Sequence, residues 1–514
     1  MKKLLFLFIL LLLPVIVLAE DFEYTIKSKV TLEGKELEGN DFTFDLYDID
    51  GNLIQTKKND KDGNITFDPI SFTAEDATER HTDASTGGNY SDERKNKYFF
   101  YIIKQRNEQQ EQITYDEETA YVGVYIYEDG DSRIDYLKDI ERIKEETTKY
   151  EVKEGSQVYH ATEEELAGQA YAVFDSDTKI LTFFRDEEGK YTDQQEIGTK
   201  KYYTNFETGA LYTPWANDDI VKIVFENPIK PKNISSSSGG TAWFSWKSNL
   251  EEIENINLLD TSETTSFNYL FTSDKKLTSL DLSTWDTSKV TDMDRMFYDC
   301  YELEEIFIDN FDTSNVTTAQ LMFGSTYKLK SINQKVFNFP KLNNSDLMFM
   351  NSKTIQGLDT STWNIQNSGG TAEIAYYMQS LVYLNVSTLP GLWSEAIGSN
   401  PQIAILDLAG EYSVVYSNIG LNGAYWYNLK THTLYTKNDL DQHLVRDKDL
   451  EPATYVSPRN NPEPSLFRNL YTEPPKEPEK ENPETGNYGL YALLILATIS
   501  GIVLITQKKI DFLK

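Results

Sequence analysis

Apolar residues recur along the middle of the chain with a fixed period of 26 residues. Each period carries two apolar positions three residues apart, and these pairs are Leu277 with Leu280, Leu303 with Ile306, Leu329 with Ile332, Ile355 with Leu358, and Leu381 with Leu384. Two aromatic columns keep the same step, namely Phe271, Phe297, Phe323 and Phe349, and Trp285, Phe311, Phe337 and Trp363. A fixed period in the range of roughly 20 to 50 residues is typical of a solenoid, in which each repeat buries its apolar face against the next.

Each repeat divides into two kinds of pattern. The stretch "LTSLDLS" alternates apolar and polar residues, which predicts a short strand. The stretch "VTDMDRMFYDC" has apolar residues at Val290, Met293, Met296 and Phe297, a spacing typical of a helix, and Thr291 with Asp294 predicts a capping box at its start. The repeats therefore predict an α/β solenoid over residues 250–408, with the leucine and aromatic columns as core and Cys300 as a packing residue.

The segments around the repeats are rich in strand patterns. Residues 21–165 contain "DFTFDLYD" and "AYVGVYIY", which alternate, and the turn-forming "DIDGN" and "NDKDGN", which predict an all-β domain. These Asp-rich turns lack the spacing and the late Glu of an EF-hand loop, so we interpret them as turns and expect no metal site. A β-rich lead-in is predicted over 168–249, a closing β cap over 409–458, and an extended Pro-rich spacer over 459–481.

The two ends of the chain predict export and a membrane stage. Residues 1–19 have two lysines, an apolar run and a small residue before Glu20, the pattern of a secretory signal peptide. Residues 488–506 form an apolar stretch long enough for a transmembrane helix, and Lys508 and Lys509 follow it. The expected product is a multidomain protein at the cell surface, whose precursor spans the membrane.

Charge and composition exclude several classes of function. The net charge of −33 and the pI near 4.5 favour repulsion of nucleic acid. The single cysteine cannot form an internal disulfide. The four histidines are scattered, and the sequence has no metalloprotease, serine-hydrolase or phosphate-loop motif. We therefore expect no enzyme activity, no catalytic residue and no cofactor, and an enzyme is the third alternative because absence of motifs does not exclude catalysis.

The repeat stretch "LSTWDTSKVTDMDRMFYDC" resembles the lines of BspA-type leucine-rich-repeat surface proteins. With the lead-in and the cap, the resemblance spans residues 168–456 and is most specific in the second and third repeats, whereas Pro340 and Gln366 interrupt it later. It implies a surface protein that acts as an adhesin or binds a ligand. The sequence does not say whether that ligand is a protein or a glycan.

The residues before the last apolar stretch resemble the LPxTG sorting signal of Gram-positive wall-anchored proteins. They are Asn482, Pro483, Glu484, Thr485 and Gly486, which begin a predicted sorting region over 482–514. The resemblance implies that a sortase cuts after Thr485 and joins the protein to peptidoglycan. Asn482 stands where Leu is usual, which leaves the sortase class open, and a simple single-pass anchor is the alternative.

The order of strands in residues 21–165 resembles the isopeptide-containing pilin domain, which implies an N-terminal β-sandwich. That family joins a Lys on the first strand to an Asn on the last, beside a Glu. Here Gln105 occupies the place of the Glu, and Lys27 and Lys29 fall on the outward phase of the first strand. We therefore expect the domain to lack the cross-link. A structural pilus subunit joined by a sortase is the alternative function, but the donor-lysine motif of the "YPK" kind is not found.

Residues that alternate with the core leucines predict a candidate binding face on the solenoid strands. They are Asp281, Phe307, Asn333, Asp359 and Asn385, with Tyr383 beside them. Two exposed aromatic rings among amides and carboxylates suit a sugar or a polar protein surface. An ordinary solvated face is the alternative interpretation.

Overall fold

The structure is a computed structural model in which residues 21–30, 36–73, 77, 95–110, 113, 115, 118–128, 132–186, 189–207, 213–235, 242–366, 373–392, 396–400, 402–409, 412, 414–415, 421, 425–446 and 452–458 are described. All of them belong to one compact unit, Met1–Phe467. The predicted signal peptide, Pro-rich spacer, sorting motif and transmembrane segment lie outside the described residues. None of the helices in the described ranges combines the length and apolarity that a bilayer crossing requires.

The N-terminal domain is built on a five-stranded antiparallel sheet in the order β4-β3-β7-β8-β9. Its strands are β3 (Thr43–Tyr47), β4 (Leu53–Lys58), β7 (Asn96–Gln105), β8 (Thr119–Tyr127) and β9 (Ser132–Leu137). Two smaller sheets pair β1 (Asp21–Tyr24) with β6 (Ile70–Thr73) and β2 (Lys27–Lys29) with β5 (Asn64–Thr66). Tyr24, Ile26 and Phe72 from these pieces share a buried core with Ile103 and Val124 of the large sheet. Residues 21–165 are therefore mostly β, but not all-β as predicted, because helix α1 (Ile140–Thr147) lies within them. The pilin resemblance stays a prediction.

A mixed sheet leads from this domain into the repeats, in the order β12-β13-β10-β11-β14-β15. Its strands are β10 (Gln169–Asp175), β11 (Ile180–Asp186), β12 (Glu196–Ile197), β13 (Lys200–Tyr203), β14 (Lys222–Phe225) and β15 (Glu252–Glu254). The strands pair antiparallel from β12 to β11, and then β14 and β15 add in parallel. The sheet therefore closes the first end of the solenoid and starts its parallel stacking.

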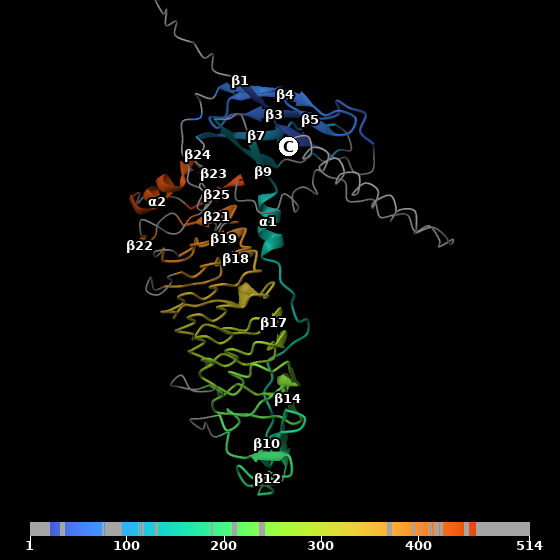
Figure 1. Cartoon of the computed structure of the whole chain (residues 1–514), viewed down its shortest axis with the longest axis vertical. Coiled ribbons are helices and arrows are strands. Elements are labelled where there is room, and N and C mark those ends of the chain that lie inside the picture. The colour runs from blue at the N-terminus through green and yellow to red at the C-terminus, as the bar shows by residue number, and fades with distance from the viewer. Residues whose placement is uncertain are drawn as a thin grey trace, which may run out of the picture. The chain divides into compact units, whose positions relative to one another are not determined.

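The repeats form a β-solenoid, drawn from green to orange in Figure 1. Its strands are β16 (Ser279–Asp281), β17 (Glu305–Phe307), β18 (Gly357–Asp359), β19 (Tyr383–Asn385) and β21 (Ile405–Leu408), and the short 3-10 helices η3 (Ile256–Leu258) and η4 (Gln334–Val336) stand in two other repeats. Pairing is parallel and in register, so Leu280 lies opposite Ile306 and Leu358 opposite Leu384. The ten leucines and isoleucines of the sequence pattern are at most 5% exposed. The repeat period and its core are confirmed.

The helix predicted in each repeat is wrong. Alternate N–H groups of residues 293–299 donate to the next repeat, for example that of Met293 to the Thr318 carbonyl at 2.9 Å and that of Phe297 to the Met322 carbonyl at 2.9 Å. The predicted capping box is also absent, because the N–H of Thr291 donates to the Thr265 carbonyl and the Asp294 carboxylate accepts the N–H of Gln320. Turns of this kind bury apolar residues at the same spacing as a helix. The solenoid is therefore β rather than α/β.

The second end of the solenoid is closed by strands from the predicted cap. These are β23 (Tyr425–Asn428), β24 (Thr433–Thr436) and β25 (Ala453–Val456), with helix α2 (Lys437–Arg446), and β20 (Gly391–Leu392) pairs with β22 (Val414–Val415). Strand β25 pairs antiparallel with β21 and so ends the parallel stack. The outer face of the five-stranded sheet packs on this cap, where Tyr98 stacks on Tyr425 with ring centroids 4.3 Å apart.

Candidate functional site

The outward residues of strands β16 to β21 form one surface, called here the strand face. Strand pairing aligns Asp281 with Phe307, and Asp359 with Asn385 and Asp407. Asn333 occupies the same place in the repeat between them, where its side chain accepts the N–H of Lys335 at the start of η4. The structure thus brings the predicted residues together along one side of the solenoid.

A segment of the same chain covers part of this strand face. Helix α1 (Ile140–Thr147) precedes residues 148–161, called here the strap, which descends beside the strands in Figure 1. The Nζ atom of Lys153 lies 3.2 Å from the Asp281 carboxylate and 5.1 Å from the centre of the Phe307 ring. Further along, the N–H of Ala161 donates to Asp260 at 2.8 Å. Phe307 is therefore half-buried under the chain itself.

Tyr383 is not an exposed aromatic residue, because it is only 4% exposed. Its hydroxyl donates to the Asp407 carboxylate at 2.9 Å, and Lys144 of α1 lies 5.5 Å from its ring centre. Burial, followed by the charge of Asp407, raises the pKa of Tyr383 well above its usual value. The prediction of two exposed rings is therefore wrong for Tyr383, which α1 covers, whereas Phe307 is half-buried beneath Lys153.

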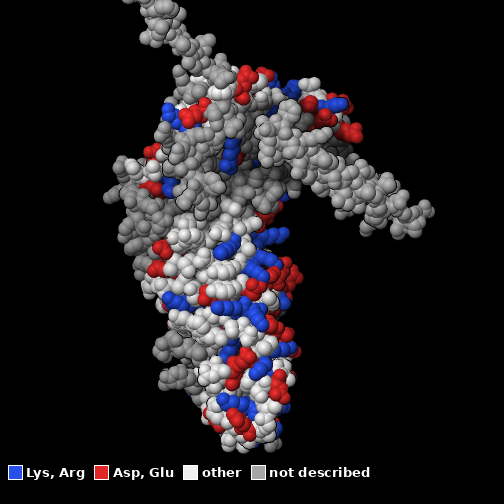
Figure 2. Space-filling view, in the orientation of Figure 1, with Lys and Arg blue, Asp and Glu red and all other residues white. Residues whose placement is uncertain are grey.

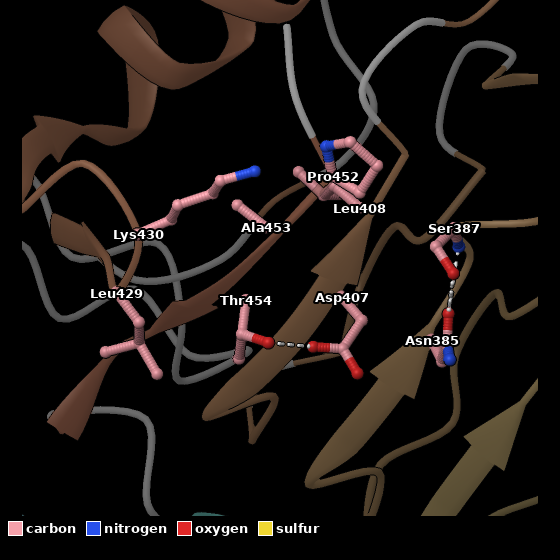
Figure 3. Close-up of a pocket in the computed structure, with 9 residues that line it drawn as sticks. All are labelled: Asn385, Ser387, Asp407, Leu408, Leu429, Lys430, Pro452, Ala453 and Thr454. Atoms are coloured by element: carbon pink, nitrogen blue, oxygen red, sulfur yellow. Dashed lines mark hydrogen bonds between the residues drawn. The ribbon is translucent and has the colours of Figure 1, made fainter.

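Beyond the strap, the strand face ends in an open cavity of about 430 Å³, drawn in Figure 3. Its lining comes from the last strands and the cap, and consists of Asn385, Ser387, Asp407, Leu408, Leu429, Lys430, Pro452, Ala453 and Thr454. Figure 3 shows Asp407 and Thr454 joined by a hydrogen bond, for which the Thr454 hydroxyl donates at 2.6 Å. Asn385 is the one member of the predicted face that lines this cavity.

Asp407 is the central polar group of the cavity. Its carboxylate lies 2.9 Å from Nζ of Lys144 and also accepts hydrogen bonds from Thr454 and Tyr383. These partners hold the carboxylate in one position, and the amide of Asn385, the hydroxyl of Ser387 and the ammonium of Lys430 stand around the rest of the cavity. Such a set of donors and acceptors is suited to a polar ligand.

The sequence pattern missed Asp407 and Thr454. Asp407 aligns with Asn385, but it follows after 22 residues rather than 26, so the fixed period does not reach it. Thr454 comes from a cap strand that folds back against β21, at a separation of 47 residues. Only the "ILDL" alternation at Ile405–Leu408, which places Asp407 on the outward phase, gave a signal.

Charged side chains along the solenoid are largely arranged in pairs between repeats. Lys330 lies 2.7 Å from Glu304, and Lys276 lies 3.1 Å from Glu251. Figure 2 shows blue and red side chains mixed along this part of the surface. Exposed pairs of this kind contribute little to stability, about 0 to 1 kcal/mol each. Among the described residues, no group of three or more His, Cys, Asp or Glu is placed to hold a metal ion.

Residues 240–363 match the family described as "Mycoplasma protein of unknown function, DUF285". This is a family of the BspA-like repeat type, and the match covers the first part of the solenoid. The chain has no match among the curated proteins or the solved structures.

Proposed function

We propose that the protein is displayed at the cell surface and binds a polar ligand through its solenoid, as an adhesin does. The observation that carries this proposal is the open cavity around Asp407, where the strand face is free of the strap and polar groups from two parts of the chain converge. The DUF285 match supports the general type of protein, a repeat solenoid of the BspA-like kind. The ligand is a polar protein segment or a glycan.

Filling the cavity is expected to abolish ligand binding. Ser387→Tyr adds a ring to the cavity lining, whereas Ser361→Tyr adds the same ring 26 residues earlier, outside the cavity. The two serines are equivalent, because each backbone N–H donates at 2.9 Å to the outward side chain two residues before it, Asn385 or Asp359. The wild-type chain is first screened on an array of glycans and extracellular-matrix proteins, and both variants are then titrated against the strongest hit.

We expect Ser387→Tyr to weaken that interaction by at least about ten-fold, equivalent to about 1.4 kcal/mol, and Ser361→Tyr to leave it unchanged. Equal affinities for the two variants would place the ligand elsewhere. An array without any hit would remove the support for a ligand-binding role.

The second part of the proposal is covalent attachment to the cell wall. A sortase would cut between Thr485 and Gly486 and pass the new carboxyl end to peptidoglycan, after the apolar stretch 488–506 has held the precursor in the membrane. Proline at 483 restricts the backbone before the cut, which favours the extended form that a protease-like site accepts. The presence of Asn482 where Leu is usual affects which class of sortase would act, and not the cleavage between Thr485 and Gly486.

Thr485→Ala is expected to shift the protein from the wall fraction to the membrane fraction or the medium. The measurement is an immunoblot of wall, membrane and medium fractions from cells that express the full chain, with Thr472→Ala in the spacer as the matched control. If detergent alone extracts all of the wild-type protein without a wall hydrolase, the anchor is the apolar stretch and the sortase proposal is wrong.

A further inference from the structure

The turns of the solenoid place residues of successive repeats in one continuous row, and its stretch from Trp246 to Tyr377 is called here the turn row. Its members are Trp246, Ser273, Asp299, Ser325, Asn351 and Tyr377, and all have left-handed backbones with φ between 60° and 64°. Ser399, with φ of 59°, continues the same row beyond Tyr377. The N–H of each donates to a carbonyl in the next repeat, for example from Asp299 to Gly324 at 3.0 Å and from Tyr377 to Gly398 at 3.1 Å. Neighbouring positions are therefore spaced like neighbouring strands, about 4.8 Å apart, and the row is about 24 Å long.

Both ends of the turn row carry an exposed aromatic ring. Trp246 is 54% exposed and Tyr377 is 42% exposed, which makes them the two most exposed aromatic residues in the described ranges. Trp246 makes no side-chain hydrogen bond or ring contact with any residue that the structure describes. A left-handed backbone is strained for a residue with a side chain, and an exposed ring gains no burial energy to offset that strain. Folding alone does not explain a tryptophan at this position.

Between these rings the residues of the turn row are polar. Ser273 and Ser325 are buried, at 5% and 4% exposure, and their side chains hydrogen-bond to the Asp299 carboxylate, as does Tyr301. Burial raises the pKa of Asp299, whereas Lys275 and these hydrogen bonds act to lower it. Asp299 and Asn351 are both partly exposed. The row therefore offers one carboxylate and one amide between two aromatic rings.

Further aromatic rings lie near the middle of the turn row. Tyr301, which hydrogen-bonds to Asp299, stacks on Tyr327 with ring centroids 4.8 Å apart and an angle of 3° between the rings. The ring of Tyr298 lies close to Gly324, where an added Cβ would come 3.0 Å from its Cδ2 atom. These rings are thus held in place by packing within the solenoid.

We propose that the turn row binds an extended, uncharged polysaccharide segment. The C–H faces of sugar rings would stack on Trp246 and Tyr377, and sugar hydroxyls would bond to Asp299 and Asn351, since aromatic and polar groups together suit a ligand with both kinds of surface. A straight row of equally spaced positions favours a linear polymer over a folded protein. The net charge of −33 disfavours an anionic polymer and does not affect a neutral one.

The turn row shares no residue with the cavity around Asp407. The proposal for the turn row and the proposal for the cavity can therefore be tested separately. The probes are soluble, uncharged oligomers of β-linked glucose and of N-acetylglucosamine, from disaccharide to octasaccharide. They are titrated calorimetrically into the full chain in mild detergent. Affinity is expected to rise with oligomer length until the oligomer spans about 24 Å, the length of the row, and then to level off.

Variants at the two ends of the row test the contact directly. Trp246→Asn and Tyr377→Asn each remove a ring, and asparagine tolerates the left-handed backbone, as Asn351 shows in the same row. Both are expected to weaken oligomer binding by at least about ten-fold without a change in melting temperature. Ile197→Ala is the matched control, because Ile197 is 50% exposed on β12 and lies outside the row.

Several results would overturn the proposal. Absence of binding for every oligomer in both series would do so, and so would equal affinities for the wild type and the two asparagine variants. If Ser387→Tyr rather than Trp246→Asn abolishes binding, the sugar occupies the cavity instead. If the two variants lose binding to a protein on the array and the wild type binds no oligomer, the turn row is a protein-binding surface.

Discussion

Replacing Phe297 with alanine is expected to lower the free energy of unfolding of the solenoid by about 4 kcal/mol. Phe297 is fully buried and stacks between Phe271 and Phe323, with ring centroids 5.6 Å and 5.3 Å away. Removing one ring from this stack leaves a cavity that the rigid repeats on either side cannot close. Because each repeat is stabilised mainly by its neighbours, the loss also weakens the coupling between the two halves of the solenoid.

The measurement is urea unfolding of the wild type and the variant, followed by circular dichroism. Phe307→Ala is the matched control in the next repeat, since its ring is half-buried on the strand face, and we expect it to cost about 1 kcal/mol. A second transition at lower urea in the Phe297 variant would show that the repeats have become uncoupled. Equal effects of the two substitutions would contradict the central role of the phenylalanine stack.

The sequence predicted the solenoid and its core because both depend on a repeated pattern. Leu280 and Ile306 stand at equivalent places in successive repeats, and parallel pairing puts them side by side. The helix was predicted wrongly for a physical reason as well. Met293 and Met296 are buried at helical spacing. Left-handed residues such as Arg295, however, form tight turns in place of a helix, and N–H groups in these turns donate to carbonyls of the next repeat. The side-chain spacing alone does not distinguish a helical turn from a pair of tight turns.

The candidate site was less predictable because it depends on contacts that have no period. Alternation correctly placed Asp281 and Phe307 on the outward side of their strands, but it contained no sign that Lys153 would cover them. The strap has no apolar repeat of its own and is held by single polar contacts, such as the N–H of Lys153 donating to Asp309 across 156 residues. The cavity likewise needs a cap strand to fold back beside Asp407. Contacts such as these between distant segments follow from the tertiary fold and cannot be read from the local sequence pattern.

Asp135 is the source of the second large effect that we expect, which is a pH dependence of stability. This residue of β9 has one carboxylate oxygen 2.9 Å from Nε of Arg133, whereas the other has no hydrogen-bond partner among the described residues. Tyr98 and Tyr125 of the same sheet lie against it, and they bring hydroxyls but no positive charge. Burial raises the pKa of Asp135 from 3.8 to about 6, although Arg133 acts to lower it.

The direction of the effect follows from proton linkage. Between pH 4 and pH 6 the folded protein holds a proton on Asp135 that the unfolded chain has already released, so raising the pH across this window favours unfolding. The full loss amounts to about 3 kcal/mol, and it persists at pH 7, where the buried carboxylate is charged. Below pH 4 both states are protonated, and the contribution to stability is complete.

Asp135→Asn is therefore expected to stabilise the protein by about 2 to 3 kcal/mol at pH 7 and to have little effect at pH 4. The asparagine keeps the shape of the side chain and remains uncharged at every pH. Because carboxylates with lowered pKa values, such as Asp45, give the opposite slope, the quantity to measure is the difference between variant and wild type in urea unfolding at each pH. Asp68→Asn is the control for loss of a carboxylate at the surface, since Asp68 is 69% exposed in its pair with Lys57. If the difference for Asp135→Asn does not change with pH, the folded protein does not bury the charge of Asp135.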